Sequence, residues 1–363
     1  MTTASNRPDT GTLSARLWDA VRKGDEDAAV QAVLSALDAG LDAESALLDV
    51  VAPVQARVGA EWAANRMSVA QEHAATAIDD HVVTAVAHRV SGSHRPSPGR
   101  VTVTCVDGEW HALPARLLAE TLRLRDWQVD FLGCQIPLPH LIDHLHRTGP
   151  DALALSSSIP TRLPTAHATI AACQAAGFPV IVGGAAFGPG GCYADRLGAD
   201  GWAPDARAAA GLLTEIVARR FGRQPPQRSV NDLPHLADRE YTSLTHDAHR
   251  HVAAVLGALR QRFPAMAEYD EQQRERTAED LAHIVDFLSV ALYLDDPELF
   301  TRFIAWIGDI LTARGVPARS VALALALDLL AERVKDLPRA VALLREGRAA
   351  LREATSHLPE TSA

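Results

Sequence analysis

The chain has 363 residues, of which 47% are hydrophobic, with a formal net charge of −10 and a pI near 5.8. This length allows two or three domains that each bury a core. The acidic balance disfavours nonspecific attraction to DNA phosphates or anionic membranes, which require a basic face. The four cysteines include no CxxC pair, and no apolar stretch is long enough to span a bilayer. We therefore expect a soluble cytoplasmic protein with reduced thiols and no membrane association.

The N-terminal region is predicted to be helical. Residues 1–14 are polar and are expected to form a flexible tail. Apolar residues then recur at helical spacing through residues 15–92, without the alternation typical of strands. This pattern predicts a four-helix bundle. A stretch rich in Ser, Pro and Gly follows at residues 91–100 and is expected to be a linker.

The middle region, residues 98–220, alternates short apolar runs with amphipathic segments. The runs VTVTCV, VDFLG, ALALSS and PVIVGG each precede a helical pattern. That order is typical of a parallel sheet covered by helices on both faces. We expect a Rossmann-like or flavodoxin-like α/β domain here.

A second irregular stretch, residues 221–236, is expected to link this domain to a C-terminal region. Residues 237–358 carry long helical patterns and no strand signal, which predicts an all-α domain of globin-like class. Within it, Gly315 and Pro317 predict a helix stop. The whole chain is therefore expected to be multidomain, combining α and α/β parts.

The loop DGEWHALP after the first predicted strand places Glu109, Trp110 and His111 where a ligand is expected. In open α/β sheets, ligands bind outside the carboxyl ends of the strands, so we expect His111 to project into the ligand crevice. The next helix can start at Pro114. Glu109 can accept the hydrogen bond of one ring N–H, which would fix the tautomer of the imidazole and raise its basicity as a ligand.

The predicted bundle contains a second group of candidate residues. Ser68 and Gln71 form a capping-box pattern, which predicts a helix beginning at Val69 with Glu72 and His73 in its first turns. Trp62 then ends the preceding helix. An indole and a Glu-His pair on adjoining helices can face one ligand. The indole would supply an aromatic face, and the carboxylate would accept hydrogen bonds from hydroxyl groups of the ligand.

Small and polar residues follow the next two strands of the predicted sheet. Ser156 and Ser158 follow the third strand, and Gly183 and Gly184 follow the fourth. Glycines permit close backbone approach, and serines supply hydrogen bonds. We expect these residues to contact the same ligand at the same sheet edge.

Over residues 15–220 the sequence resembles the adenosylcobalamin-dependent photoreceptor module, on Trp62 with Glu72-His73 and on the Glu109-Trp110-His111 loop. The resemblance implies adenosylcobalamin held base-off, with His111 as the lower axial ligand of cobalt and the nucleotide tail beside the serines and glycines. It also implies that light cleaves the cobalt–carbon bond, driving a conformational change, and that His73 can ligate cobalt afterwards. Two positions depart from the family pattern, with Pro114 in place of a glycine and Ser158 in place of a leucine.

The C-terminal helices resemble those of the photocobilins, in which such a domain binds biliverdin as a second chromophore. A bilin requires an apolar slot, acceptors for pyrrole N–H groups and cations for propionates. No cysteine follows Cys192, so biliverdin would bind this domain noncovalently. The expected contacts on one helix face are Asp280, His283 and Phe287, at positions i, i+3 and i+7. Arg302 and Trp306, an i, i+4 pair, are the expected contacts on the next helix.

Other functions remain open at this stage. A corrinoid methyl carrier that serves a methyltransferase has the same layout, although Trp62 with Glu72-His73 argues against it. Aromatic residues at helical spacing are also typical of ordinary packing, so the C-terminal helices could serve assembly alone. A haem ligated by His283 is a further possibility.

The light-sensor interpretation carries expectations about partners. Only about 14 polar residues precede the first helix, too few for a helix-turn-helix domain, so direct DNA binding is not expected. We expect a non-enzymatic signalling protein that forms a homo-oligomer and acts on a protein partner that the sequence does not identify.

Overall fold

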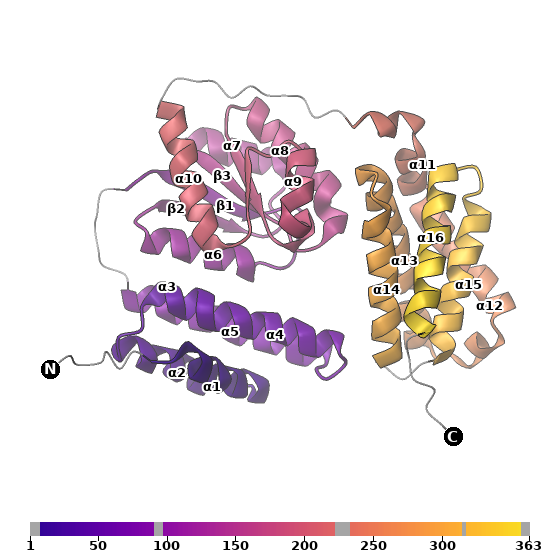
Figure 1. Cartoon of the computed structure of the whole chain (residues 1–363), viewed down its shortest axis with the longest axis horizontal. Helices are drawn as coiled ribbons and strands as arrows, with labels where there is room; N and C mark the ends of the chain where they lie inside the picture. Colours follow the sequence, from indigo (N-terminus) through magenta and orange to yellow (C-terminus); the bar gives the residue numbers. More distant parts are fainter. Residues whose placement is uncertain (1–7, 91–96, 222–232, 314–316, 357–363) are drawn as a thin grey trace. The chain divides into compact units, whose positions relative to one another are not determined.

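A computed structural model describes residues 8–90, 97–221, 233–313 and 317–356. The chain divides into two compact units, Met1–Asn231 and Asp232–Ala363 (Figure 1). The first unit combines a helical cap with an α/β domain, and the second unit is helical throughout its described residues. The predicted combination of α and α/β parts is confirmed.

The cap is a four-helix bundle, as predicted. Its first helix begins at Thr10, earlier than expected, because Asp9 accepts a 2.8 Å hydrogen bond from the Thr12 N–H and caps it. The predicted capping box is present: the Gln71 N–H donates to Ser68 Oγ, and the Ser68 N–H donates to Gln71 Oε1. The elements of the cap are α1 Thr10–Lys23, α2 Glu26–Asp38, α3 Ala43–Ser45, η1 Ala46–Val51, α4 Ala52–Ala63 and α5 Val69–Val90.

The third helix of the cap runs from α3 through η1 into α4, and η1 is a π-helical segment. A π-turn holds more residues than an α-turn and is common at functional sites. Leu47 is fully buried in the cap core, whereas the next two residues, Leu48 and Asp49, are only partly buried. Within this segment, Leu47 therefore packs in the cap core, whereas Leu48 and Asp49 are accessible from outside it.

The α/β domain is built on a five-stranded parallel sheet with strand order β2-β1-β3-β4-β5. This is the flavodoxin-like order, so the predicted doubly wound architecture is confirmed. The buried strands, such as β3 with all five residues buried, read as continuous apolar runs because helices cover both faces. The strands are β1 Arg100–Cys105, β2 Gln128–Gly133, β3 Ala152–Ser156, β4 Val180–Gly183 and β5 Gly201–Ala203.

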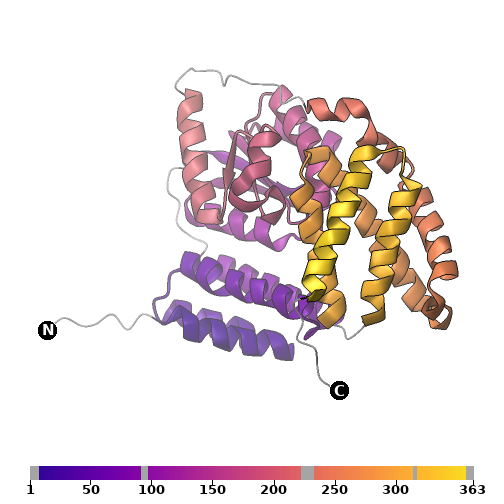
Figure 2. The same cartoon turned by 45° about the vertical axis from the view of Figure 1, so that its right-hand side comes forward.

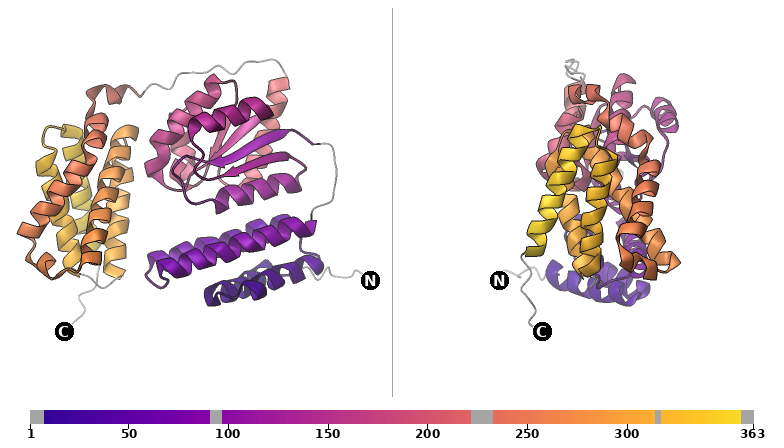
Figure 3. Two further views of the ribbon diagram at one scale, coloured as in Figure 1. Left: turned by 180° about the vertical axis from the view of Figure 1, so that it is seen from behind. Right: turned by 90° about the vertical axis from the view of Figure 1, so that its right-hand side faces the viewer.

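Helices lie on both faces of this sheet (Figure 3). Helices α6 and α10 share one face, where their alanines and leucines form a core with β1, β3 and β4. The cap packs on the outside of α6, because Leu113 and Leu117 of that helix belong to the cap core. The helices are α6 Leu113–Leu124, α7 Leu138–Thr148, α8 Leu163–Ala175, α9 Cys192–Arg196 and α10 Ala206–Phe221.

The second unit is a bundle in which the long helices run side by side (Figure 2). Helix α14 ends at Ala313 and α15 begins at Pro317, while Gly315 of the predicted stop lies outside the described residues. None of the described helices is long and apolar enough to cross a membrane. The helices are α11 Glu240–His246, α12 Ala248–Arg262, α13 Glu271–Leu294, α14 Pro297–Ala313, α15 Pro317–Arg333 and α16 Pro338–Ser356.

Candidate functional site

The carboxylate of Glu109 organises the loop after β1. Its Oε1 accepts hydrogen bonds from the Trp110 and His111 N–H groups and contacts His111 Nδ1 at 2.6 Å. Its Oε2 accepts hydrogen bonds from Ser157 Oγ at 3.2 Å and from the Ser158 N–H at 2.7 Å. The Glu109 side chain is fully buried, so these donors replace water as its solvation. The loop is therefore tied to the end of β3.

The electrostatics of the Glu109–His111 pair favour a charged carboxylate. Burial raises the pKa of Glu109, but the His111 ring and the backbone N–H groups outweigh it and lower the pKa to about 2. In turn, the hydrogen bond to Glu109 raises the pKa of His111 above its ordinary value. With Nδ1 engaged by Glu109 and the side chain 52% exposed, Nε2 is the ring atom available to a ligand.

On the cap, Glu72 and His73 form the pair that the sequence predicts, with 2.6 Å between His73 Nδ1 and Glu72 Oε2. Glu72 Oε1 also accepts a 3.0 Å hydrogen bond from Thr76, whose hydroxyl accepts one from Gln55 on α4. Glu72 is thus oriented by two helices. The His73 side chain is 75% exposed and points away from the cap core.

The hydrogen bond and charge of Glu109 raise the pKa of His111, and the negative charge of Glu72 on the cap adds to this effect. Trp62, near the end of α4, is partly buried and packs against the cap core. Trp110 is 72% exposed, and its backbone N–H is the group that binds Glu109. Glu72 is therefore a cap candidate whose charge acts on the loop.

A cavity of about 320 Å³ lies at the carboxyl ends of β3, β4 and β5. Ser156, Gly183 and Gly184 line it, as the sequence predicts. Ser158 is not among its lining residues, and instead its N–H holds Glu109. The neighbouring Ser157 hydroxyl also donates to this carboxylate, so both serines help to hold the loop after β1.

Gly184 is required at its position for two reasons. Its φ of +98° is a conformation that residues with a side chain rarely adopt. A Cβ atom there would also lie 2.2 Å from the carbonyl oxygen of Ser157. The absence of a side chain lets the turn after β4 pack against the segment that holds Glu109.

Sequence reasoning missed part of the cavity wall. Leu48 and Ala52 of the cap line it, together with Pro204, Asp205 and Arg207 after β5. The β5 residues had a detectable signal, because every strand of a parallel sheet ends at the same edge. Leu48 and Ala52 had none, because their contribution depends on how the cap packs on the α/β domain.

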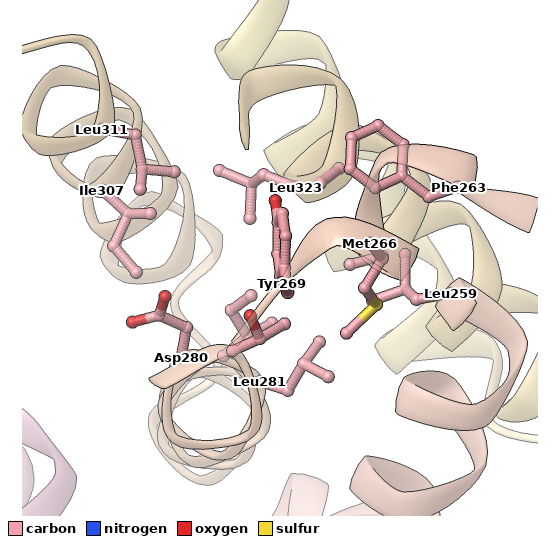
Figure 4. Close-up of a pocket in the computed structure, with 13 residues that line it drawn as sticks. Leu259, Phe263, Met266, Tyr269, Asp280, Leu281, Ile307, Leu311 and Leu323 are labelled. Atoms are coloured by element: carbon pink, nitrogen blue, oxygen red, sulfur yellow. The ribbon is translucent and has the colours of Figure 1, made fainter. Parts of the chain in front are cut away.

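In the second unit, the five expected bilin contacts do not surround one cavity. Asp280 lines a small pocket of about 50 Å³ with Tyr269, Ile307 and Leu311 (Figure 4). The other four residues do not line this pocket: His283, Arg302 and Trp306 are exposed, and Phe287 is half-buried.

Phe287 explains this difference from the expectation. Its ring stacks on Phe303 at 3.6 Å between centroids, and Phe303 in turn lies 6.1 Å from Trp306. At Phe287 the predicted helix face therefore packs against α14 instead of lining a pocket. Arg302 Nη1 forms an ion pair of 3.3 Å with Glu298 on its own helix.

A larger groove of about 440 Å³ lies between α12 and α13. Its walls are mainly small apolar residues, with His249 and Asp286 as the polar ones. Ligand sites typically occupy 300 to 1,000 Å³, so this groove has the size of a ligand site and the 50 Å³ pocket does not. His283 lines neither of them.

Comparison with known proteins shows that the first unit contains two B12 binding domains. Residues 13–86 match one model of a B12 binding domain, and residues 99–211 match a second. The monomethylamine corrinoid protein of Methanosarcina barkeri has the same fold, with a TM-score of 0.52 and 17% identity over 57% of this chain and 100% of that one. No curated protein matches the sequence.

Two further structures are similar at lower TM-scores. A cobalamin-binding protein from Desulfitobacterium hafniense gives 0.33 at 19% identity, over 56% of this chain and 98% of that one. The methanol:cobalamin methyltransferase complex of Methanosarcina barkeri gives 0.31 at 16% identity, over 58% of this chain and 82% of that one.

The residues present fit a corrinoid. A corrin supplies four nitrogen ligands to its metal, and His111 offers Nε2, with its tautomer fixed by Glu109, as an axial ligand. The cavity beside Gly183 and Gly184 offers room for a nucleotide tail. Among the described residues, no cluster of three or more His, Cys, Asp or Glu could hold a metal ion by itself.

Proposed function

We propose that this protein, whose residues 13–86 and 99–211 form a cobalamin-binding module, is a light sensor that uses adenosylcobalamin. The observation that carries the proposal is that Glu109, held by backbone N–H groups and by Ser157, binds Nδ1 of His111 and leaves Nε2 to a ligand, while the charge of Glu72 on the cap acts on the same ring. When bound, adenosylcobalamin supplies a cobalt–carbon bond that light can cleave.

His111 is the proposed lower axial ligand, through Nε2. Glu109 holds the ring by Nδ1, and it is itself held by backbone N–H groups and by Ser157. Such outer partners fix ring orientation and raise ligand basicity. These contacts within the protein fix the loop, so little ordering of it is left for binding to accomplish.

The cap residues are proposed to enclose the upper ligand. Trp62 supplies an aromatic face, and Glu72 supplies a carboxylate oriented by Thr76 for the ribose hydroxyls. His73 is hydrogen-bonded through Nδ1, which leaves Nε2 as a ligand atom on an exposed side chain. Loss of the upper ligand removes the contacts that favour the closed cap, so the cap can move.

Biliverdin is proposed as a second, noncovalent chromophore of the second unit. The groove between α12 and α13 supports this proposal, because its volume of about 440 Å³ suits a tetrapyrrole and its walls are apolar. Light absorbed there would extend the response to longer wavelengths.

A corrinoid methyl carrier is the second candidate, favoured by the full-length fold match to the monomethylamine corrinoid protein. One experiment separates the two. The chain is reconstituted in the dark with adenosylcobalamin and biliverdin, and its absorption spectrum is recorded before and after green light. A light sensor changes its cobalamin bands, and a retained red band reports the bilin.

Replacing His73 sharpens the experiment. His73→Ala is expected to bind adenosylcobalamin in the dark as the wild type does, but to give a different spectrum after illumination. His81→Ala is a matched control, because His81 is also exposed on α5 and pairs with a glutamate. A wild-type spectrum that light leaves unchanged would favour the carrier.

A further inference from the structure

Four charged side chains connect the cap to the α/β domain at a distinct point. Arg125, at the end of α6, donates to both carboxylate oxygens of Glu44 at 2.9 Å. Arg207, in the first turn of α10, donates through Nε to Glu44 at 3.0 Å. Its two terminal nitrogens each donate to one oxygen of Asp49 at 2.8 Å.

This network is stronger than an isolated surface ion pair. Both arginines bind carboxylates in the bidentate geometry that guanidinium groups favour. The Glu44 side chain is only 23% exposed, and its hydrogen bonds to Arg125 lower its pKa. Salt bridges contribute appreciably when several charges form a network with good geometry.

The same segment of the cap is a wall of the cavity at the strand ends. Asp49 lies in the π-helical segment η1, next to Leu48, and both Leu48 and Arg207 line the cavity. Ala52 lines it from the following turn. Arg207 therefore lines the cavity and also holds η1, the segment of the cap that forms one wall of this cavity.

We propose that Arg207 determines specificity for corrinoids that carry a nucleotide tail, by fixing η1 as the cap wall of the tail cavity. The inference rests on the proposed cobalamin site. The corrin itself is held through His111, whereas the tail depends on the ion pairs of Glu44, Asp49, Arg125 and Arg207. Arg207 is a positioning residue, because its donors are used by the two carboxylates.

The test compares two ligands that share the corrin and differ in the tail. Hydroxocobalamin has the nucleotide, and hydroxocobinamide lacks it. Both are titrated in the dark against wild type and Arg207→Ala, with binding followed by absorbance. The variant is expected to bind hydroxocobalamin about five- to tenfold more weakly, and hydroxocobinamide with less than about a twofold change.

Two further variants keep the test decisive if Arg207→Ala is poorly folded. Arg207→Lys keeps the charge without the fork of donors and is expected to give a smaller, tail-dependent loss. Asp49→Asn removes the charge by which Arg207 holds η1 and is expected to give a tail-dependent loss in the same direction. Arg262→Ala, which removes an ion pair with Glu332 in the second unit, is the control and should bind both ligands normally.

The outcomes are distinguishable. Equal weakening of both ligands, or no weakening of either, would overturn the role of Arg207 in tail specificity. A wild-type chain that binds neither ligand would overturn the proposed function itself.

Discussion

Glu109 and His111 lie two residues apart in one loop, and Glu109 Oε1 approaches Nδ1 of the His111 ring to 2.6 Å. The other oxygen of Glu109 is held from the end of β3. The orientation of the His111 ring therefore depends on the end of β3 as well as on its own loop.

Glu109→Gln is expected to weaken corrinoid binding about 10- to 100-fold, the usual effect of removing a partner that orients a metal-bound histidine. The amide would also place an N–H group against the donors of Ser158 or His111. Dissociation constants for hydroxocobalamin measure the effect. Glu120→Gln removes another buried, ion-paired carboxylate of the same domain and should bind as the wild type does.

Corrinoid affinity is expected to fall as the solution is acidified. His111 has to be deprotonated at Nε2 to bind cobalt, and Glu109 raises the pKa of the protonated ring. The loss should therefore begin above pH 6.5, the ordinary pKa of histidine. Titrations between pH 5 and 9 give the midpoint, and in Glu109→Gln it should move to lower pH. An affinity independent of pH would exclude His111 as the ligand.

Gly184→Ala is expected to destabilise the first unit by more than ~2 kcal/mol, because it combines backbone strain with a clash against Ser157. Gly133→Ala separates the two effects, since Gly133 also has a positive φ of 75° but has no atom within 4 Å of an added Cβ. That control should cost about 1–2 kcal/mol. Urea unfolding measures both, and equal losses would contradict the close approach of the two backbones.

The buried Asp79 is expected to make the stability of the cap depend on pH. It is fully buried on α5, neither carboxylate oxygen has a hydrogen-bond partner, and burial raises its pKa to about 8 from an ordinary value of 3.8. Between these values the folded state holds a proton that the unfolded state has released. The contribution of protonated Asp79 to the free energy of unfolding is therefore complete below pH 3.8 and is lost as the pH rises through about 8.

Asp79→Asn is expected to remove this dependence, so that its stability relative to the wild type rises by up to ~1.4 kcal/mol for each pH unit between pH 5 and 8. Unfolding free energies at pH 5, 6.5 and 8 test it. Asp80→Asn, at the adjacent and partly exposed position, should keep the slope of the wild type. An identical slope in Asp79→Asn would show that another group is responsible.

The sequence allowed accurate prediction where a signal is local. Ser68 with Gln71 marks the start of α5 because a capping box is contained in four residues. Apolar runs followed by helical patterns indicate the parallel sheet, and the sheet edge then places the loop of Glu109 and His111. These inferences need only neighbouring residues and a general rule of α/β folds.

The remaining features depend on contacts between distant segments. The π-helical turn that brings Leu48 and Asp49 toward Arg207 has no signature in the spacing of apolar residues. The five C-terminal candidates share helix faces, but spacing does not reveal that Phe287 stacks on Phe303 and closes the interface there. Likewise, spacing does not reveal that the Ser157 hydroxyl and the Ser158 N–H hold Glu109.

The central claim is that light opens the cap at the end that carries Glu72 and His73. Hydrogen–deuterium exchange of the adenosylcobalamin-loaded protein, in the dark and after green light, tests it most directly. We predict faster exchange after illumination in the first turns of α5, near Val69–Thr76, with little change in η1, and no light effect with hydroxocobalamin. Exchange in α5 that is the same in darkness and light would contradict the account.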